Sequence, residues 1–222
     1  MLGREQTTAS VVVPRQRQGE VGRHRAAASP RPLWPVPVGL TALSLALGLV
    51  TLGRQSLWDD EAFSAAAARL PWDGLWALSS TRDPHMLGYH GFLKVWALLG
   101  GTGEWWLRLP SAAAGAASVA VLWVAAHRLA GARVAAVAAG MLAASTTLVQ
   151  YQQEARPYAF AVLGTCVAVW LLVRAVQLGG TDRWLVFGVV AGATVYTHPM
   201  AVAAAAGTAL SVLVMSGRPP RR

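Results

Sequence analysis

The chain has 222 residues, of which 55% are hydrophobic and only 13% are charged, and its mean hydropathy is +0.42. A typical soluble domain has about 25% charged residues, so this composition indicates a membrane protein with several spans. The formal net charge of +9 comes almost wholly from arginine. The basic residues lie between hydrophobic runs, and we therefore expect no nucleic-acid partner.

Residues 1–32 are rich in Arg, Ala, Pro and Gln and contain almost no large apolar side chains. Such a composition is typical of a disordered segment. The apolar run that follows is too long for a signal peptide. We expect a basic cytoplasmic tail that helps to fix topology and contacts anionic membrane lipid.

Five uncharged hydrophobic runs follow the tail. A helix needs about 20 residues to cross the hydrocarbon core, and the first four runs each fit one span. The fifth run contains His198-Pro199 near its middle, where a proline favours a break, so we predict a hairpin. The predicted fold is all-α, a polytopic membrane protein with about six transmembrane helices. The runs are 33–52, 109–127, 134–153, 157–173 and 184–217.

The distribution of charge predicts the orientation of these spans. With a cytoplasmic N-terminus, most arginines fall on the inner side and most carboxylates on the outer side, as the positive-inside rule requires. The first outer loop, 53–108, is then large. Its apolar segment 84–101 carries His85, His90 and Lys94, so we predict amphipathic interfacial helices there rather than another span. The tryptophans of this loop are predicted interfacial anchors: Trp72, Trp76, Trp96, Trp105 and Trp106.

Three consecutive carboxylates, Asp59, Asp60 and Glu61, follow the first run. Adjacent carboxylates repel one another, which raises at least one pKa and can leave a carboxylate able to accept a proton near neutral pH. From these residues alone, a solvated acidic loop is an equal alternative, because perturbed acids mark sites only statistically.

A second polar cluster, Glu154, Arg156 and Tyr158, lies where the third span returns as the fourth. At this position Arg156 would lie at headgroup depth, and a guanidinium binds phosphate oxygens in pairs. Glu154 could orient that guanidinium or contact a sugar. The alternative is that Glu154 and Arg156 only cap two helix ends, next to Pro157 at the start of a helix.

Four further residues have two interpretations each. Asp83, before Pro84, is a helix N-cap or part of an acceptor site together with His85. Arg108 is a structural interfacial arginine or a phosphate ligand. His198 lies at the outer end of a span, where polar groups are often functional, but a single His is more often a satisfied structural residue than a ligand. A divalent cation between His198 and a carboxylate stays open, although no ligand spacing demands it.

Five segments in this order resemble the N-terminal half of the polyprenyl-phosphate-dependent GT-C glycosyltransferases, the group of protein O-mannosyltransferases and aminoarabinose transferases. Within this group the chain is most similar to bacterial mannosyltransferase-like proteins. The segments are 58–62, 83–85 with Tyr89, 104–111, 153–158 and 196–198. The similarity runs from about residue 33 to the C-terminus. Within it, 33–217 would form the transmembrane domain, and 218–222 would be a short basic cytoplasmic end.

The resemblance implies an inverting transfer of a sugar, with mannose as the candidate, from a polyprenyl-phosphate donor to a hydroxyl of a protein, glycan or lipid acceptor. The active face would lie outside the plasma membrane of a bacterium. Asp60 would be the catalytic base, with Glu61 beside it, and Arg156 would bind the donor phosphate. The other residues that we expect on the substrate side are Asp59, Asp83, His85, Arg108, Glu154, Tyr158 and His198.

Two departures from the family pattern keep other functions open. After His85 the chain reads Met86-Leu87, where many relatives have a second proline and paired aromatics. Relatives are also usually longer, so the chain could be a fragment, a non-catalytic half or a membrane scaffold. A transporter or flippase is the remaining alternative, but it would place ionisable groups near the middle of spans.

Overall fold

The computed structural model describes residues 34–82, 84–199 and 201–216, and in these residues every regular element is a helix. This confirms the all-α prediction. The predicted tail, the basic C-terminal end and Asp83 lie outside the described residues.

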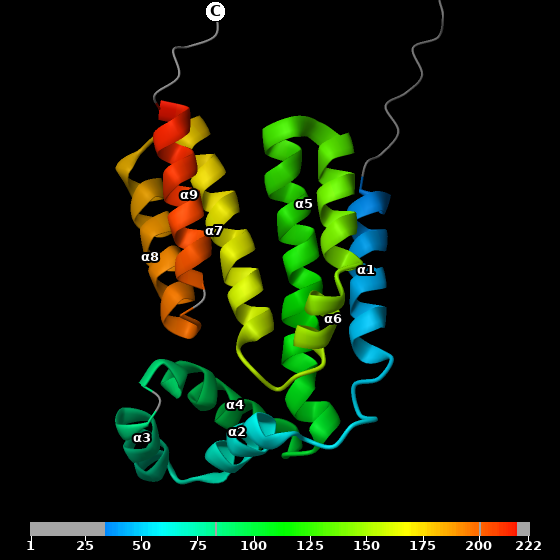
Figure 1. Ribbon diagram of the computed structural model, residues 1–222, viewed down its shortest axis with the longest axis vertical. Coiled ribbons are helices and arrows are strands. Elements are labelled where there is room, and N and C mark those ends of the chain that lie inside the picture. Colours follow the sequence, from blue (N-terminus) through cyan, green and yellow to red (C-terminus); the bar gives the residue numbers. More distant parts are fainter. Residues whose placement is uncertain (1–33, 83, 200, 217–222) are drawn as a thin grey trace, which may run out of the picture. The chain divides into compact units, whose positions relative to one another are not determined.

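Six of the helices follow the predicted hydrophobic runs. α1 packs against α5, α5 against α7, and α7 against α8, while α9 contacts both α7 and α8 (Figure 1). These helices are α1 (Pro35–Leu49), α5 (Glu104–Ala143), α6 (Thr146–Gln152), α7 (Tyr158–Leu178), α8 (Thr181–Thr197) and α9 (Ala201–Ser216).

The helix α5 consists of two arms joined by a sharp bend. Gly131 lies at the bend with φ 83° and ψ 178°, a conformation that costs glycine little because it has no Cβ. Figure 1 shows α5 turning back on itself. The bend falls between two predicted runs, and the second of these runs is divided again where Ser145 caps α6 by accepting a hydrogen bond from Leu148 N (3.4 Å).

Two helices in the described part of the chain are long and apolar enough to cross a membrane, namely α5 and α7. α1, α8 and α9 have 15, 17 and 16 residues and are shorter than a typical span. The count of six spans therefore stays a prediction.

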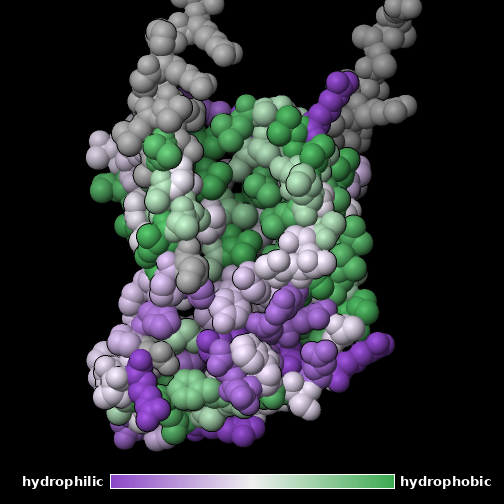
Figure 2. All heavy atoms as spheres, in the orientation of Figure 1, coloured by the Kyte–Doolittle hydropathy of each residue, from purple (hydrophilic) through white to green (hydrophobic). Residues whose placement is uncertain are grey.

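The predicted first outer loop is largely helical. It contains α2 (Asp59–Arg69), α3 (Trp72–Thr81), the 3-10 helix η1 (Pro84–Met86) and α4 (Leu87–Gly100). The C-terminal end of α8 reaches the same region, since Tyr196 donates its hydroxyl hydrogen to the carbonyl of Pro84 (2.6 Å). On the face shown in Figure 2, hydrophilic residues gather around α2, α3 and α4, and hydrophobic residues cover the other helices.

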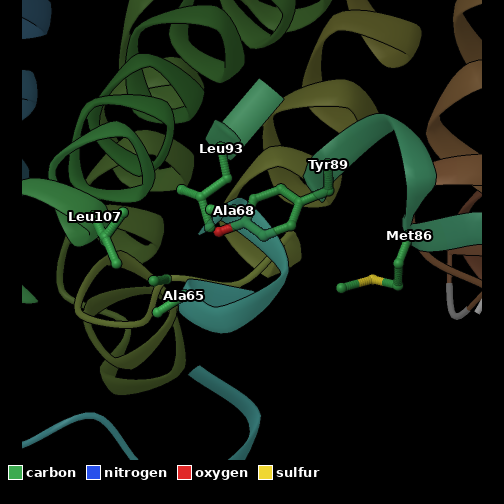
Figure 3. Packing of buried hydrophobic residues seen from close by; sticks show 7 residues of the cluster. Ala65, Ala68, Met86, Tyr89, Leu93 and Leu107 are labelled. Carbon is green, nitrogen blue, oxygen red and sulfur yellow. The ribbon is translucent and has the colours of Figure 1, made fainter. Parts of the chain in front are cut away.

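A small hydrophobic core holds α2 in place. Figure 3 shows Leu93 of α4 and Leu107 of α5 beside Ala65 and Ala68 of α2. Both leucines are completely buried, and burying each one contributes about 1.5–3 kcal/mol. The alanines keep α2 thin enough for close packing. Ala155, between α6 and α7, belongs to the same cluster, so the core brings the acidic start of α2 to the α6–α7 turn.

Two of the tryptophans predicted as interfacial anchors instead pair with each other. The rings of Trp96 and Trp106 stack at 4.4 Å with an interplanar angle of 7°. Each indole N–H also donates to the other residue's carbonyl, at 2.8 and 3.0 Å. Because both polar groups are satisfied inside the protein, the pair fastens α4 to α5. Trp72, Trp76 and Trp105 are exposed, as an anchoring role requires.

Candidate functional site at the start of helix α2

The three acidic residues form the first turn of α2, where the helix dipole favours negative charge. Successive helical residues point roughly 100° apart, so the three carboxylates cannot share one environment. Asp59 is exposed, the Asp60 side chain is 47% exposed, and Glu61 is completely buried. The structure thus separates the two residues predicted to act together.

Asp60 pairs with Arg156. Its Oδ2 lies 3.2 Å from Arg156 Nη2, and Arg156 Nη1 donates to the Asp60 carbonyl at 3.5 Å. The guanidinium also lies 5.7 Å from the centre of the Tyr158 ring, a cation–π contact. The Nε of Arg156 is buried and has no hydrogen-bond partner among the described residues. Each Nη group uses only one of its two N–H donors in the contacts with Asp60, and the side chain is 16% exposed, so Arg156 keeps donor capacity that a ligand could use.

Arg108, by contrast, has no spare donor. Its Nε and Nη2 donate to the two carboxylate oxygens of Glu61 at 2.8 and 2.6 Å. The remaining N–H groups donate to three backbone carbonyls, those of Leu52, Gln55 and Ser56. A guanidinium has five N–H donors, and all of them are used. Of the two interpretations offered by the sequence, this geometry favours the structural one over phosphate binding.

An open pocket of about 880 Å³ lies beside this region. Its lining includes both ends of α6 and the start of α7, and it reaches the buried Glu61–Arg108 pair. Asp60 and Arg156 are not among the described lining residues, although Glu61, Glu154 and Tyr158, each within two residues of them in the chain, are. Among the lining residues that offer polar or aromatic contacts are Trp58, Gln150, Tyr151, Glu154, Tyr158 and His198.

Besides the buried Glu61, the carboxylate that lines this pocket is the half-buried Glu154. Gln150, four residues earlier, donates to its Oε1 at 3.0 Å. Burial raises the pKa of Glu154 above its ordinary value of 4.5, and the charge of Glu61 adds to this effect. The hydrogen bond from Gln150 and the charge of Arg156 oppose the rise. Glu154 is therefore a second group that could accept a proton.

Aromatic rings form one side of the pocket. Tyr158 contacts Tyr151 at 5.0 Å and His198 at 5.1 Å between ring centres. Burial lowers the pKa of His198 below 6.5, and the positive charges of His85 and Arg156 lower it further. The His198 imidazole is thus neutral at neutral pH. The sequence singled out Tyr158 and His198 but not Tyr151, which follows Gln150 on α6 and had no motif to mark it.

The site has no evident cage for a cation. In the ranges that the structure describes, no group of three or more His, Cys, Asp or Glu side chains could hold a metal ion. His85 is half-buried in η1, and Asp83 beside it lies outside the described residues. The Asp60–Arg156 pair is the ion pair of this site that is partly open to solvent, whereas the Glu61–Arg108 pair is buried.

Comparison with known protein families finds a match to the dolichyl-phosphate-mannose-protein mannosyltransferase family over residues 84–221, more than half of the chain. The matched segment contains Arg108, Glu154, Arg156 and His198 but begins after the acidic turn of α2. Curated proteins and solved structures give no match.

Proposed function

The chain belongs to the dolichyl-phosphate-mannose-protein mannosyltransferase family, and on that basis we propose that it transfers a sugar from a polyprenyl-phosphate donor to an acceptor hydroxyl outside the cytoplasm. Members of this family are GT-C-type glycosyltransferases and membrane proteins. Mannose is the candidate sugar, and a protein, glycan or lipid is the acceptor.

We place the protein in a bacterial plasma membrane with six spans: α1, the two arms of α5 with α6 completing the second arm, α7, α8 and α9. The bend of α5 and the α7–α8 connection lie at one end of these helices, while α2, α3 and α4 lie at the other (Figure 1). The arginines near the bend and the α7–α8 connection support a cytoplasmic location for that end. The acids and the pocket would then face outward.

The single observation that carries the proposal is the contact between Asp60 and Arg156. A transfer with inversion needs a base at the acceptor hydroxyl and positive charge at the departing phosphate. Asp60 is the more exposed of the two paired side chains, at 47% against 16%, so it can be reached by an acceptor. Beside it, each Nη group of Arg156 has a second N–H donor that its contacts with Asp60 leave unused.

In the proposed step, the acceptor oxygen forms a bond to the anomeric carbon while the bond from that carbon to the phosphate oxygen breaks. The hydroxyl proton passes to Asp60, and the electron pair leaves with the polyprenyl phosphate, whose charge Arg156 stabilises. No general acid is required, because a phosphate is a good leaving group. Glu61 takes no part in this step, since it is buried and bonded to Arg108.

The pocket supports the binding of a sugar or acceptor. Ligand sites usually measure about 300–1,000 Å³ and combine aromatic walls with a few polar groups. Here the volume is about 880 Å³, with Tyr151 and Tyr158 as aromatic walls and Gln150 and Glu154 as hydrogen-bonding groups. We assign the hexose and the acceptor hydroxyl to this space, next to Asp60.

The proposal is tested by transfer of labelled mannose from polyprenyl-phosphate mannose in membranes that contain the chain. Arg156→Ala should reduce transfer by raising the donor KM, because a phosphate contact is lost. Arg82→Ala, which removes an exposed arginine at the end of α3, is the matched control and should leave transfer unchanged. Equal effects of the two changes would show that Arg156 is no special phosphate ligand, and absence of transfer by the unaltered chain would favour a non-catalytic scaffold.

A further inference from the structure

Glu61 is the centre of a buried polar cluster that connects four segments. Its Oε1 accepts hydrogen bonds from Arg108 Nε (2.8 Å) and from the backbone N–H of Ala155 (2.6 Å). Its Oε2 accepts from Arg108 Nη2 (2.6 Å). Three donors on two oxygens, without any solvent exposure, make this carboxylate one of the most constrained groups in the described chain.

Through Arg108, the cluster extends to the loop after α1. The Nη1 group of Arg108 donates to the carbonyls of Leu52 and Gln55, both at 2.8 Å, and Nη2 donates to that of Ser56 at 3.2 Å. The segments joined in this way are the α1–α2 loop, the first turn of α2, the start of α5 and the α6–α7 turn. They are distant in sequence, since Glu61 and Ala155 are 94 residues apart.

The two residues of the proposed reaction are each adjacent in the chain to a member of this cluster. Asp60 precedes Glu61, and Arg156 follows Ala155. The hydrogen bond from the Ala155 N–H to Glu61 therefore also fixes the position of the Arg156 backbone relative to Asp60. Ala155 is itself completely buried in the core of Figure 3, which limits other positions of the turn.

We propose that Glu61 is a positioning residue, which with Arg108 holds the α6–α7 turn against α2 and so sets Arg156 beside Asp60. This inference rests on the proposed function for its catalytic consequence, while the positioning itself does not depend on it. Glu61 is not suited to be the base, because accepting a proton would break the ion pair and leave the Arg108 charge buried without a partner.

The first experiment reads the position of the turn without catalysis. In Arg156→Cys, a water-soluble maleimide should label position 156 slowly, because the Arg156 side chain is only 16% exposed. Adding Glu61→Gln should accelerate this labelling severalfold, since the turn loses its ionic anchor. The single native cysteine, buried Cys166, reports unfolding and should stay unlabelled. Asp73→Asn, an exposed change on α3, is the control and should not alter the rate.

The labelling rate at position 156 decides whether Glu61 positions the α6–α7 turn. An unchanged rate at position 156, with Cys166 protected, would overturn the positioning role. If Cys166 becomes reactive, Glu61→Asp replaces Glu61→Gln, because it keeps the charge and shortens the side chain by one methylene. Faster labelling at position 156 in that variant, with Cys166 protected, supports the proposal, and an unchanged rate overturns it.

The second experiment measures transfer from polyprenyl-phosphate mannose. Glu61→Gln should raise the donor KM, and a displacement of about 1 Å can reduce turnover by about 100-fold. In an Arg156→Ala background, Glu61→Gln should add little to the donor KM. Both changes act on the same contact, the one between Arg156 and the donor phosphate, so their effects should not add. Lost turnover with an unchanged donor KM would identify Glu61 as the base and overturn the proposal. If the unaltered chain transfers no sugar, the proposed function fails, and the labelling experiment still decides the positioning role.

Discussion

The carboxylate of Asp60 lies 3.2 Å from the guanidinium of Arg156, across a sequence separation of 96 residues. Two opposite charges at this distance on a partly exposed surface add little stability, so the pair is poorly explained as a structural device. The nearby Glu61–Arg108 pair is buried and fully bonded, as a structural device should be. The site thus has one ion pair suited to a structural role, Glu61–Arg108, and one suited to the proposed reaction, Asp60–Arg156.

Gly100→Ala should destabilise the protein by separating α4 from α5. A Cβ at Gly100 would lie 2.3 Å from Trp106 Cε2, within the stacked pair of Trp96 and Trp106. Overpacking of this kind costs about 1–3 kcal/mol. Thermal unfolding in detergent measures the change. Gly103→Ala is the control, since a Cβ there meets nothing within 4 Å, and equal unfolding temperatures for the two variants would contradict the packing argument.

Gly115→Ala should loosen α6 from α5. Its Cβ would lie 2.3 Å from Cγ of Gln152, whose side-chain amide donates to Ser44 and to the Ala112 carbonyl at 3.2 Å. Moving Gln152 would break these buried hydrogen bonds, each worth about 0.5–1.5 kcal/mol. Unfolding by a denaturing detergent should therefore occur earlier than in the parent.

The control for that change is Gly140→Ala, in the second arm of α5, where a Cβ has open space. Alanine is favoured over glycine in a helix by about 1 kcal/mol, so this variant should be as stable as the parent or more stable. A loss of stability in Gly140→Ala as large as in Gly115→Ala would show that contact with Gln152 is not the cause.

His198 should make stability depend on pH. Burial holds the pKa of His198 below its ordinary value of 6.5, so the unfolded chain binds more protons than the folded one in the range just below pH 6.5. The contribution is fully present above that value and is lost as pH falls through the folded pKa. Unfolding temperatures between pH 5 and pH 8 should show a smaller decrease on the acidic side in His198→Gln.

The exposed His127 of α5 supplies the comparison for this experiment. His127→Gln should keep the pH dependence of the parent, because the change lies on an exposed side chain outside the site. If both variants keep the full dependence, the acid sensitivity comes from other groups, and the environment assigned to His198 is wrong.

The helices could be predicted from the sequence more completely than their boundaries. Uncharged runs of roughly span length predicted the positions of α1 and α7, because a continuous apolar run of about 20 residues is typical of a transmembrane helix. The division of the run 134–153 was not predicted, since the cap at Ser145 lies within an otherwise apolar segment. Helix periodicity predicted neither the Trp96–Trp106 pair nor its hydrogen bonds, which depend on how α4 meets α5.

The site could be predicted only in part. The sequence marked Asp60, Glu154 and Arg156 by their chemistry, and the fold brings Asp60 and Arg156 together. The sequence could not show that the Asp60 side chain is partly exposed and Glu61 buried, because this difference follows from the start of α2 at Asp59. Nor could it show that Arg108 has its donors occupied, since the carbonyls that it binds are more than fifty residues away in sequence.

Glu154 offers a rival to Asp60 as the base, because burial raises its pKa above the ordinary value of 4.5 and it lines the pocket. Glu154→Gln should preserve the hydrogen-bonding shape of the side chain while removing its basicity. We expect this variant to keep most of its turnover at saturating donor, with a modest rise in KM for the sugar substrate. Loss of turnover equal to that of Asp60→Asn would transfer the role of base to Glu154.

The most direct test of the account is the rate of mannose transfer from polyprenyl-phosphate mannose by Asp60→Asn, compared with Asp73→Asn at equal protein levels. General-base catalysis contributes about 10²–10⁴-fold, so Asp60→Asn should lose turnover by that factor while its donor KM changes little, and Asp73→Asn should match the parent. Turnover by Asp60→Asn at the parent rate would contradict the assignment of the base and with it the central claim.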